Sequence, residues 1–286
     1  MTATPRVAVI GAGTMGHGIA YVAALADCDV VLTDARADAL SAAMSKIGTL
    51  LDGAVSRGKI PDTERGAIER RLHTDAVLAS AVRAADVVIE AVVEDLAIKQ
   101  RLLAEVERAA PAEALLASNT SSLSIGAIAS GLTHPARLVG MHFFNPVHVM
   151  RLVEVVTHGR ESTPAANRAV EFARRLKKEP IVVRDSPGFA SSRLGVMLGL
   201  EAMRMLEQQV ASAEDIDKAM ELGYNHPMGP LKLTDLVGLD VRLAIAEYLH
   251  KTLGGSQYEP PQILRDKVKK GELGKKTGKG FYTWSD

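Results

Sequence analysis

Residue types suited to proton transfer stand close together between residues 118 and 156. Ser118 opens the sequence Ser-Asn-Thr-Ser-Ser, His142 lies among apolar residues, and Glu154 is embedded in a valine-rich run. A buried imidazole or carboxylate is costly unless it is paired, so His142 and Glu154 would tend to pair with each other. The set offers a base, a carboxylate to orient it, and hydroxyl groups for a substrate. With a hydride acceptor nearby, the chemistry would be oxidation of an alcohol or reduction of a ketone.

A glycine-rich segment near the N-terminus has the form of a dinucleotide-binding turn. The apolar run 6–10 leads into Gly11-Ala12-Gly13-Thr14-Met15-Gly16, and a helix-forming stretch follows. Gly11 would permit the tight turn, Gly13 would let the backbone approach a diphosphate, and Gly16 would let the helix pack closely on the strand. The diphosphate would lie at the helix N-terminus, where unpaired amides favour an anion.

The residue that would select the cofactor is Asp34, which ends the next apolar run, residues 29–33. An acid there can accept hydrogen bonds from ribose hydroxyls and would repel the 2′-phosphate of NADP. NAD is therefore the predicted cofactor, with NADP kept open by the nearby Arg36.

Length and composition exclude several classes of protein. At 286 residues the chain can hold two domains, each with its own core. Lys plus Arg and Asp plus Glu are equal at 34 each, so bulk charge does not argue for nucleic acid or an anionic membrane. The single cysteine, Cys28, excludes an internal disulfide and a cysteine-based metal cluster, and we expect no metal.

The hydropathy pattern gives no indication of a membrane segment. No apolar run approaches the roughly 20 residues of a membrane span, and the first predicted strand begins at residue 6, which leaves no room for a signal peptide. These features predict a cytoplasmic protein.

Apolar runs alternate with helix-forming stretches through residues 1–185, which predicts a doubly wound, mostly parallel Rossmann-type sheet. The predicted strands are 6–10, 29–33, 86–92, 115–118, 137–141, 152–156 and 180–183, and the predicted helices are 37–55, 62–71, 96–110 and 164–176. Because ligands bind at the carboxyl ends of such strands, the glycine loop, Asp34, Ser118 and His142 would face one crevice.

The pattern changes after Asp185-Ser186-Pro187-Gly188, and we expect a domain boundary there. Residues 186–286 would form an all-helical domain, with helices near 195–208, 213–222 and 230–250, the last broken at Gly238. Ser212 is a candidate capping residue for the second of these helices. The Met and Leu stripes are more typical of a core or a subunit interface than of a cofactor site.

Specific motifs run in order along nearly the whole chain. They are GAGTMG with Asp34, EAVVE at 90–94, SNTSS at 118–122, HFFNPV at 142–147, LVEVV at 152–156, DSPGF at 185–189, HPMGP at 226–230 and GKKTGKGFY at 274–282. In these motifs the chain resembles the L-3-hydroxyacyl-CoA dehydrogenase family, and most closely its short bacterial 3-hydroxybutyryl-CoA members.

The resemblance implies a reaction and a role for each matched residue. The enzyme would interconvert (S)-3-hydroxyacyl-CoA and 3-ketoacyl-CoA with NAD, would prefer short acyl chains, and would dimerise through the helical domain. His142 would be the general base, Glu154 its orienting acid, and Ser121 the hydroxyl on the substrate oxygen. The other implied positions are Thr14, Met15, Glu94, Lys99, Asn145 and Lys276 for the cofactor, which Ser121 would also contact, and Asn145, Arg57 and Lys59 for the substrate and its CoA phosphates. For Lys99 and Lys276 the alternative is a solvated surface charge, and for Arg57 and Lys59 an ordinary exposed helix end.

One position departs from the family pattern. Many members carry an asparagine in a Pro-Gly-Phe-x-x-Asn-Arg sequence, whereas this chain has Ser192 there. Serine is shorter and lacks the two-ended reach of an amide, so Ser192 is a candidate catalytic residue whose contribution to rate and chain-length preference would differ.

Two other functions compete with this interpretation. A dehydrogenase of the 3-hydroxyisobutyrate or 6-phosphogluconate type would need a lysine on the first helix of the second domain, but residues 189–206 contain none. A non-catalytic NAD(H)-binding structural or sensor protein would not need the complete set of Ser121, His142 and Glu154.

Overall fold

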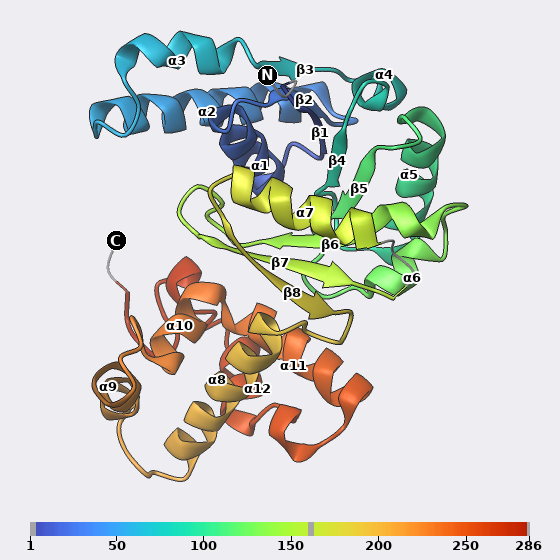
Figure 1. Ribbon diagram of the computed structural model, residues 1–286. Coiled ribbons are helices and arrows are strands. Elements are labelled where there is room, and N and C mark those ends of the chain that lie inside the picture. The colour runs from blue at the N-terminus through green and yellow to red at the C-terminus, as the bar shows by residue number, and fades with distance from the viewer. Residues whose placement is uncertain (1–3, 160–162, 285–286) are drawn as a thin grey trace. The chain divides into compact units, whose positions relative to one another are not determined.

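The computed structural model describes residues 4–159 and 163–284, and the chain divides into two compact units, Met1–Asp185 and Ser186–Asp286 (Figure 1). The first three residues, which bear on the expected absence of a signal peptide, lie outside this description. No helix within the described ranges is both long and apolar enough to cross a membrane.

The first unit is built on one eight-stranded sheet with the order β3-β2-β1-β4-β5-β6-β7-β8. Neighbouring strands are parallel except at β6 and β7, which pair antiparallel. The strands are β1 Arg6–Ile10, β2 Asp29–Thr33, β3 Leu72–Thr74, β4 Val87–Glu90, β5 Leu115–Ser118, β6 Leu138–Phe143, β7 Leu152–Thr157 and β8 Glu179–Arg184. The predicted fold class, a mostly parallel doubly wound sheet followed by a helical domain, is confirmed. Sequence reasoning missed β3, because three residues with two exposed side chains give no apolar run.

Helices cover both faces of this sheet. They are α1 Thr14–Leu25, α2 Ala37–Ser56, α3 Asp62–Glu69, α4 Leu78–Val82, α5 Leu96–Ala109, α6 Ile125–Ala129 and α7 Thr163–Arg175, with a short η1 at Pro135–Arg137. Residues of α1, α2 and α7 share one hydrophobic core with alternate residues of the strands, while α4, α5 and α6 adjoin one another around the remaining face (Figure 1).

The side chains of β6 and β7 point alternately to the two faces of the sheet, and this determines which face carries the polar ones. Met141 and Phe143 of β6 join the core on the side of α1 and α7, as do Val153 and Val155 of β7. Successive side chains of a strand point to opposite faces, so the residues between them, His142 included, project to the other face of the sheet.

The described part of the second unit is built of helices, with isolated antiparallel bridges from Lys279 to Gly274 and Thr283 near its end. Its elements are α8 Ser191–Glu207, α9 Ala213–Gly223, α10 Pro230–Val237, α11 Leu239–Leu253, η2 Ser256–Tyr258, α12 Gln262–Lys269 and η3 Lys275–Thr277. The expected break at Gly238 is present, with a φ of 102°, and Ser212 caps α9 by accepting a hydrogen bond from the Asp215 amide at 3.1 Å. α12 was not predicted.

A buried aspartate ties the C-terminal segment to the second unit. Asp235 is fully buried and accepts hydrogen bonds from the backbone amides of Phe281 and Tyr282 and from the indole nitrogen of Trp284, at 2.8–2.9 Å. A Cβ on Gly280 would lie 2.2 Å from a carboxylate oxygen of Asp235, so only glycine allows this approach. The GKGFY part of the C-terminal motif is therefore shaped by Asp235.

Candidate active site

The central feature of the site is a histidine–glutamate pair between two strands. His142 and Glu154 are direct partners in the antiparallel register of β6 and β7, which places both side chains on the same face of the sheet. His142 Nδ1 lies 2.8 Å from Glu154 Oε2, and the two residues are 6% and 0% exposed. The ring of Phe144 packs against the imidazole at 4.4 Å between centroids.

This geometry defines which nitrogen can act as a base. A carboxylate accepts hydrogen bonds, so Nδ1 is the nitrogen that carries the proton toward Glu154, and the basic nitrogen of the neutral ring is Nε2. Glu154 would also stabilise the imidazolium once Nε2 takes up a proton, because opposite charges attract strongly in a buried environment. The arrangement is that of a positioned general base.

The hydroxyl cluster after β5 is organised by one carboxylate, Glu94. Its Oε1 accepts hydrogen bonds from the Thr120 hydroxyl at 2.5 Å, from the Ser121 amide at 3.0 Å and from the Ser122 amide and hydroxyl, while the Ser121 hydroxyl lies 3.4 Å away. Burial by itself would raise the pKa of Glu94, but the hydrogen bonds from Thr120 and the backbone, together with the nearby Lys99, lower it. Glu94 is therefore an anion that fixes the turn carrying Ser121.

A buried ion pair beneath this turn was not predicted. Lys99 is 1% exposed, and its Nζ lies 2.5 Å from Glu90 Oε1 and 3.4 Å from Glu94 Oε2. The alternative of a solvated surface lysine at this position is therefore wrong. Ser118, which was expected to face the ligand crevice, is instead fully buried and donates to Glu90 Oε2 at 2.6 Å.

A second contact that sequence reasoning missed joins the hydroxyl cluster to the strand of the base. Asn119 Oδ1 accepts a hydrogen bond from the Phe143 amide at 2.9 Å. The loop after β5 is thereby fixed to the end of β6, next to His142. An asparagine in a hydroxyl-rich turn gives no signal of such a long-range contact.

The glycine loop between β1 and α1 suits a dinucleotide. A Cβ at Gly16 would lie 1.6 Å from the Gly11 carbonyl oxygen, so the close helix–strand approach excludes any side chain there. Gly13 is the N-cap of α1, has no side-chain cap, and has open space around it, which leaves the first amides of the helix to an anion. Asp34 follows β2 and accepts hydrogen bonds from the Ala12 and Arg36 amides at 2.8 and 2.9 Å.

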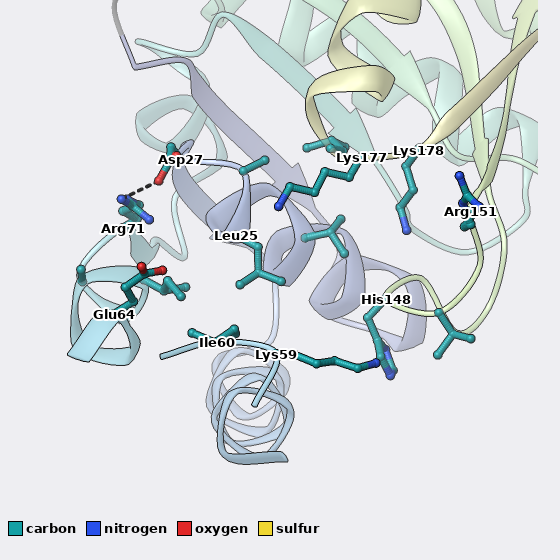
Figure 2. A pocket seen from close by; sticks show the side chains of 16 residues that line it. Leu25, Asp27, Lys59, Ile60, Glu64, Arg71, His148, Arg151, Lys177 and Lys178 are labelled. Carbon is teal, nitrogen blue, oxygen red and sulfur yellow. Dashed lines mark ion pairs between the residues drawn. The ribbon is translucent and has the colours of Figure 1, made fainter. Parts of the chain in front are cut away.

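The remaining predicted site residues are distributed over both units. Asn145 is exposed and precedes the cis peptide bond to Pro146. Arg57 follows α2, and Lys59 lines a cavity of the first unit (Figure 2). Ser192 and Lys276 belong to the second unit, where Ser192 is in the first turn of α8 and Lys276 forms an ion pair with Asp240 at 2.6 Å. Among the described residues, no group of three or more His, Cys, Asp or Glu side chains is arranged to hold a metal.

The fold and these contacts define an NAD-binding oxidoreductase with a separate helical domain. The model of the family "3-hydroxyacyl-CoA dehydrogenase, NAD binding domain" matches residues 6–186, and that of the "3-hydroxyacyl-CoA dehydrogenase, C-terminal domain" matches residues 188–284. The chain belongs to the 3-hydroxyacyl-CoA dehydrogenase family and is an enzyme, as its resemblance in sequence implied.

Individual relatives cover the chain from end to end. A probable 3-hydroxybutyryl-CoA dehydrogenase of Bacillus subtilis is 42% identical over 98% of each chain, and a 3-hydroxybutyryl-CoA dehydrogenase of Mycobacterium tuberculosis is 42% identical over 99% of each. The crystal structure of an (S)-3-hydroxybutyryl-CoA dehydrogenase from Ralstonia eutropha has a TM-score of 0.95 and 35% identity, and the match covers 99% of this chain and 100% of that one. These matches support the dehydrogenase interpretation against the non-catalytic alternative.

Proposed function

We propose that this enzyme interconverts (S)-3-hydroxybutyryl-CoA and acetoacetyl-CoA with NAD, and that His142 and Glu154 perform the proton transfer. The observation that carries the proposal is the buried hydrogen bond from His142 Nδ1 to Glu154 Oε2, set by the register of β6 and β7. Relatives with this substrate in their names match the whole chain, which favours the four-carbon substrate over longer ones.

In the oxidative direction, His142 Nε2 removes the proton of the C3 hydroxyl. The bound NAD supplies the hydride acceptor for C3. Glu154 holds the imidazole in the required tautomer and stabilises the imidazolium, and a base of this kind typically contributes about 10²–10⁴-fold in rate. The Ser121 hydroxyl bonds the substrate oxygen, and Glu94 keeps the Ser121 turn in place.

Several residues are assigned to binding in the same proposal. Asp34 selects NAD over NADP, because its carboxylate would repel a 2′-phosphate. The residue that would favour NADP is Arg36, which is largely exposed and whose Nε lies 3.9 Å from Asp38 Oδ1. The diphosphate would be held by the glycine loop, at Gly11, Gly13, Thr14, Met15 and Gly16. The others proposed are Glu94, Lys99, Asn145 and Lys276 on the cofactor, and Asn145, Arg57, Lys59 and Ser192 on the substrate side.

The proposal extends to the assembly. The unit 1–185 would bind NAD, and the unit 186–286 would bind substrate and form a homodimer. Large apolar side chains that stay exposed on its helices support an interface, namely Leu194, Met197, Leu233, Leu236 and Val241. A cytoplasmic enzyme would meet both NAD and acyl-CoA, which are intracellular metabolites.

The test is NADH oxidation with acetoacetyl-CoA, followed at the nicotinamide absorbance, with NADPH in parallel. The His142→Gln variant should lose about 10²–10⁴-fold in kcat, while His73→Gln, at an exposed histidine on β3, should behave as the wild type. Tight NADH binding without oxidation by any 3-ketoacyl-CoA would overturn the proposal.

A further inference from the structure

A cavity of about 590 Å³ in the first unit has a strongly cationic lining (Figure 2). Its walls come from the end of α1, the α2–α3 turn, α3, the β6–β7 loop and the α7–β8 turn. The charged side chains that line it are Lys59, Arg71, Arg151, Lys177 and Lys178 against Asp27 and Glu64, with His148 beside them. Phosphate groups are the natural ligands of such a surface.

Not all of these cations are equally available to a ligand. Arg71 is paired with Asp27 at 2.6 Å and Arg151 with Glu179 at 2.6 Å. Within the described residues, no ion pair engages Lys59 or Lys177. Figure 2 shows Lys59 extending toward His148, with Lys177 and Lys178 projecting from across the cavity. Lys59 and Lys177 are the lysines of the lining that can meet an anion, because the buried ammonium group of Lys178 donates to backbone carbonyl oxygens.

The loop that carries His148 is held on both sides. Val147 is buried, and a Cβ on Gly18 would lie 2.9 Å from its side chain, so the loop rests directly on α1. The ammonium group of Lys178 donates to the carbonyl oxygens of Val147 and Met150, the residues before and after the segment with His148. The imidazole is therefore presented at the cavity by a fixed backbone, with the Tyr21 ring edge-on to it at 6.1 Å between centroids.

The loop that carries His148 lies at the same edge of the sheet as His142, the proposed base. β6 ends at Phe143, one residue past His142, and Phe143 pairs with Val153 of β7. β8 starts beside the same end of β7, where Leu152 pairs with Glu179. The β6–β7 loop and the α7–β8 turn with Lys177 thus adjoin the end of β6 that carries His142.

The groups that face His148 come from every element packed around it. Desolvation lowers the pKa of His148 below its ordinary value, and the basic side chains nearby lower it further; in decreasing order they are Lys178, Arg57, Lys59 and His17. Glu64 also lines the cavity, from α3. Both effects favour the neutral form of the imidazole in the free enzyme.

We propose that His148 is a specificity-determining residue that takes up a proton when the phosphate end of an acyl-CoA enters this cavity, and so couples substrate affinity to pH. The proposal rests on the function proposed above. An acyl-CoA brings a diphosphate and a 3′-phosphate, whose negative charge reverses the local field and whose oxygens accept charge-assisted hydrogen bonds from Lys59, Lys177 and the imidazolium.

The direction of the pH effect follows from the two states of His148. A bound phosphate favours the charged imidazole, so His148 binds its proton more tightly in the complex than in the free enzyme. Affinity for CoA therefore increases as pH falls through the pKa of the complex, and it levels off below the pKa of the free enzyme. Above the pKa that His148 has in the complex, its contribution to the affinity for CoA is lost.

The first experiment is calorimetric titration of the enzyme with free CoA at pH 7, in two phosphate-free buffers of different ionisation enthalpy. The wild type should take up a fraction of a proton on binding. His148→Gln should take up less, and its affinity should be weaker than that of the wild type by a factor that grows as pH falls, up to about tenfold for a shift of one pKa unit. The control is His134→Gln, an exposed histidine outside the cavity, which should match the wild type.

Kinetics separate this inference from the proposed function. With NADH, the ratio of KM for acetoacetyl-pantetheine to KM for acetoacetyl-CoA should fall from pH 6 to pH 8 in the wild type, by up to about tenfold for a shift of one pKa unit, and this fall should be absent in His148→Gln. The pantetheine substrate has no phosphates, so it reports proton transfer at His142 alone. If both substrates are oxidised or reduced normally but the ratio and proton uptake are the same in His148→Gln, the inference is wrong and the function stands. If neither substrate reacts, the proposed function has failed, while the CoA titration still tests His148.

Discussion

The buried carboxylates of the two units have different kinds of hydrogen-bond partner. In the first unit, Glu154 pairs with the imidazole of His142 and Glu90 pairs with the amino group of Lys99, so each acid meets a basic side chain. In the second unit, Asp235 and Asp217 are held mainly by backbone amides, and Asp217 also by the hydroxyl of Tyr282. Both arrangements satisfy a buried charge.

The difference shows which acids can take part in chemistry. A carboxylate surrounded by amide and aromatic donors has no partner that exchanges protons near neutral pH, and Tyr282 is moved further from doing so because desolvation and Asp217 raise its pKa. A carboxylate paired with an imidazole stabilises a proton that can move. Burial alone would not distinguish Glu154 from Asp235, since both are fully buried.

The largest effect should come from removing one partner of the buried ion pair. Lys99→Met leaves Glu90 without its cation, although Ser118 and the Val92 amide still donate to it. The free energy of unfolding should fall by about 3–5 kcal/mol, because an uncompensated buried charge is costly. Urea unfolding at pH 7 measures this. The double variant Glu90→Gln/Lys99→Met should recover much of the loss, and no recovery would show that Lys99 stabilises the unit by packing.

The next effect should be on rate rather than stability. In Glu154→Gln the amide can no longer stabilise an imidazolium at His142, and it can present a donor that favours the wrong tautomer. We expect kcat to fall about 10²–10³-fold with a small change in melting temperature. The matched control is Glu179→Gln on the adjacent strand, whose exposed pair with Arg151 should matter little. Equal losses of kcat in both variants would contradict a special role for Glu154.

In the second unit, substitution of the buried Asp235 should reduce stability, in contrast to the loss of rate expected at Glu154. Asp235→Asn puts an amide NH₂ against at least one of three donors and removes the charge that they satisfy. The free energy of unfolding should decrease by about 2–3 kcal/mol, in line with hydrogen bonds to charged groups. Thermal melting followed by tryptophan fluorescence is informative, because Trp284 itself donates to Asp235. Unchanged stability with a large loss of proton-transfer rate would remove the contrast between the two kinds of buried acid.

Much of the site was predictable because its signals are local or periodic. His142 and Glu154 stand out as polar residues in apolar runs, and alternation along two strands is sufficient to place them on one face. The glycine loop and Asp34 are recognisable because strand, turn and helix follow one another directly in the chain. The fold class follows from the same alternation of elements.

The contacts that sequence reasoning missed join residues distant in the chain. Nothing local to Lys99 indicates burial, since the helix that carries it is rich in charged residues; its position against Glu90 depends on how α5 packs on β4. Ser118 and Ser121 are three positions apart in one hydroxyl cluster, yet Ser118 turns inward to Glu90 and Ser121 stays exposed near Glu94. Their different environments arise where β5 ends, which composition does not reveal.

The smallest effect on kcat is expected at Ser192, and it tests whether a polar group of the second unit contributes to the reaction. Ser192 lies in the first turn of α8, partly exposed, where the family pattern has asparagine. Ser192→Ala should lower kcat by about 2–10-fold, the range of one ordinary hydrogen bond, and Ser192→Asn should restore or exceed wild-type turnover because the amide reaches further and has two ends. Steady-state kinetics with acetoacetyl-CoA and longer 3-ketoacyl-CoAs provide the measurement. Wild-type kinetics in Ser192→Ala would show that Ser192 takes no part in turnover. The proton-transfer groups would then all belong to the first unit, and the buried carboxylates of the second unit would serve only its stability.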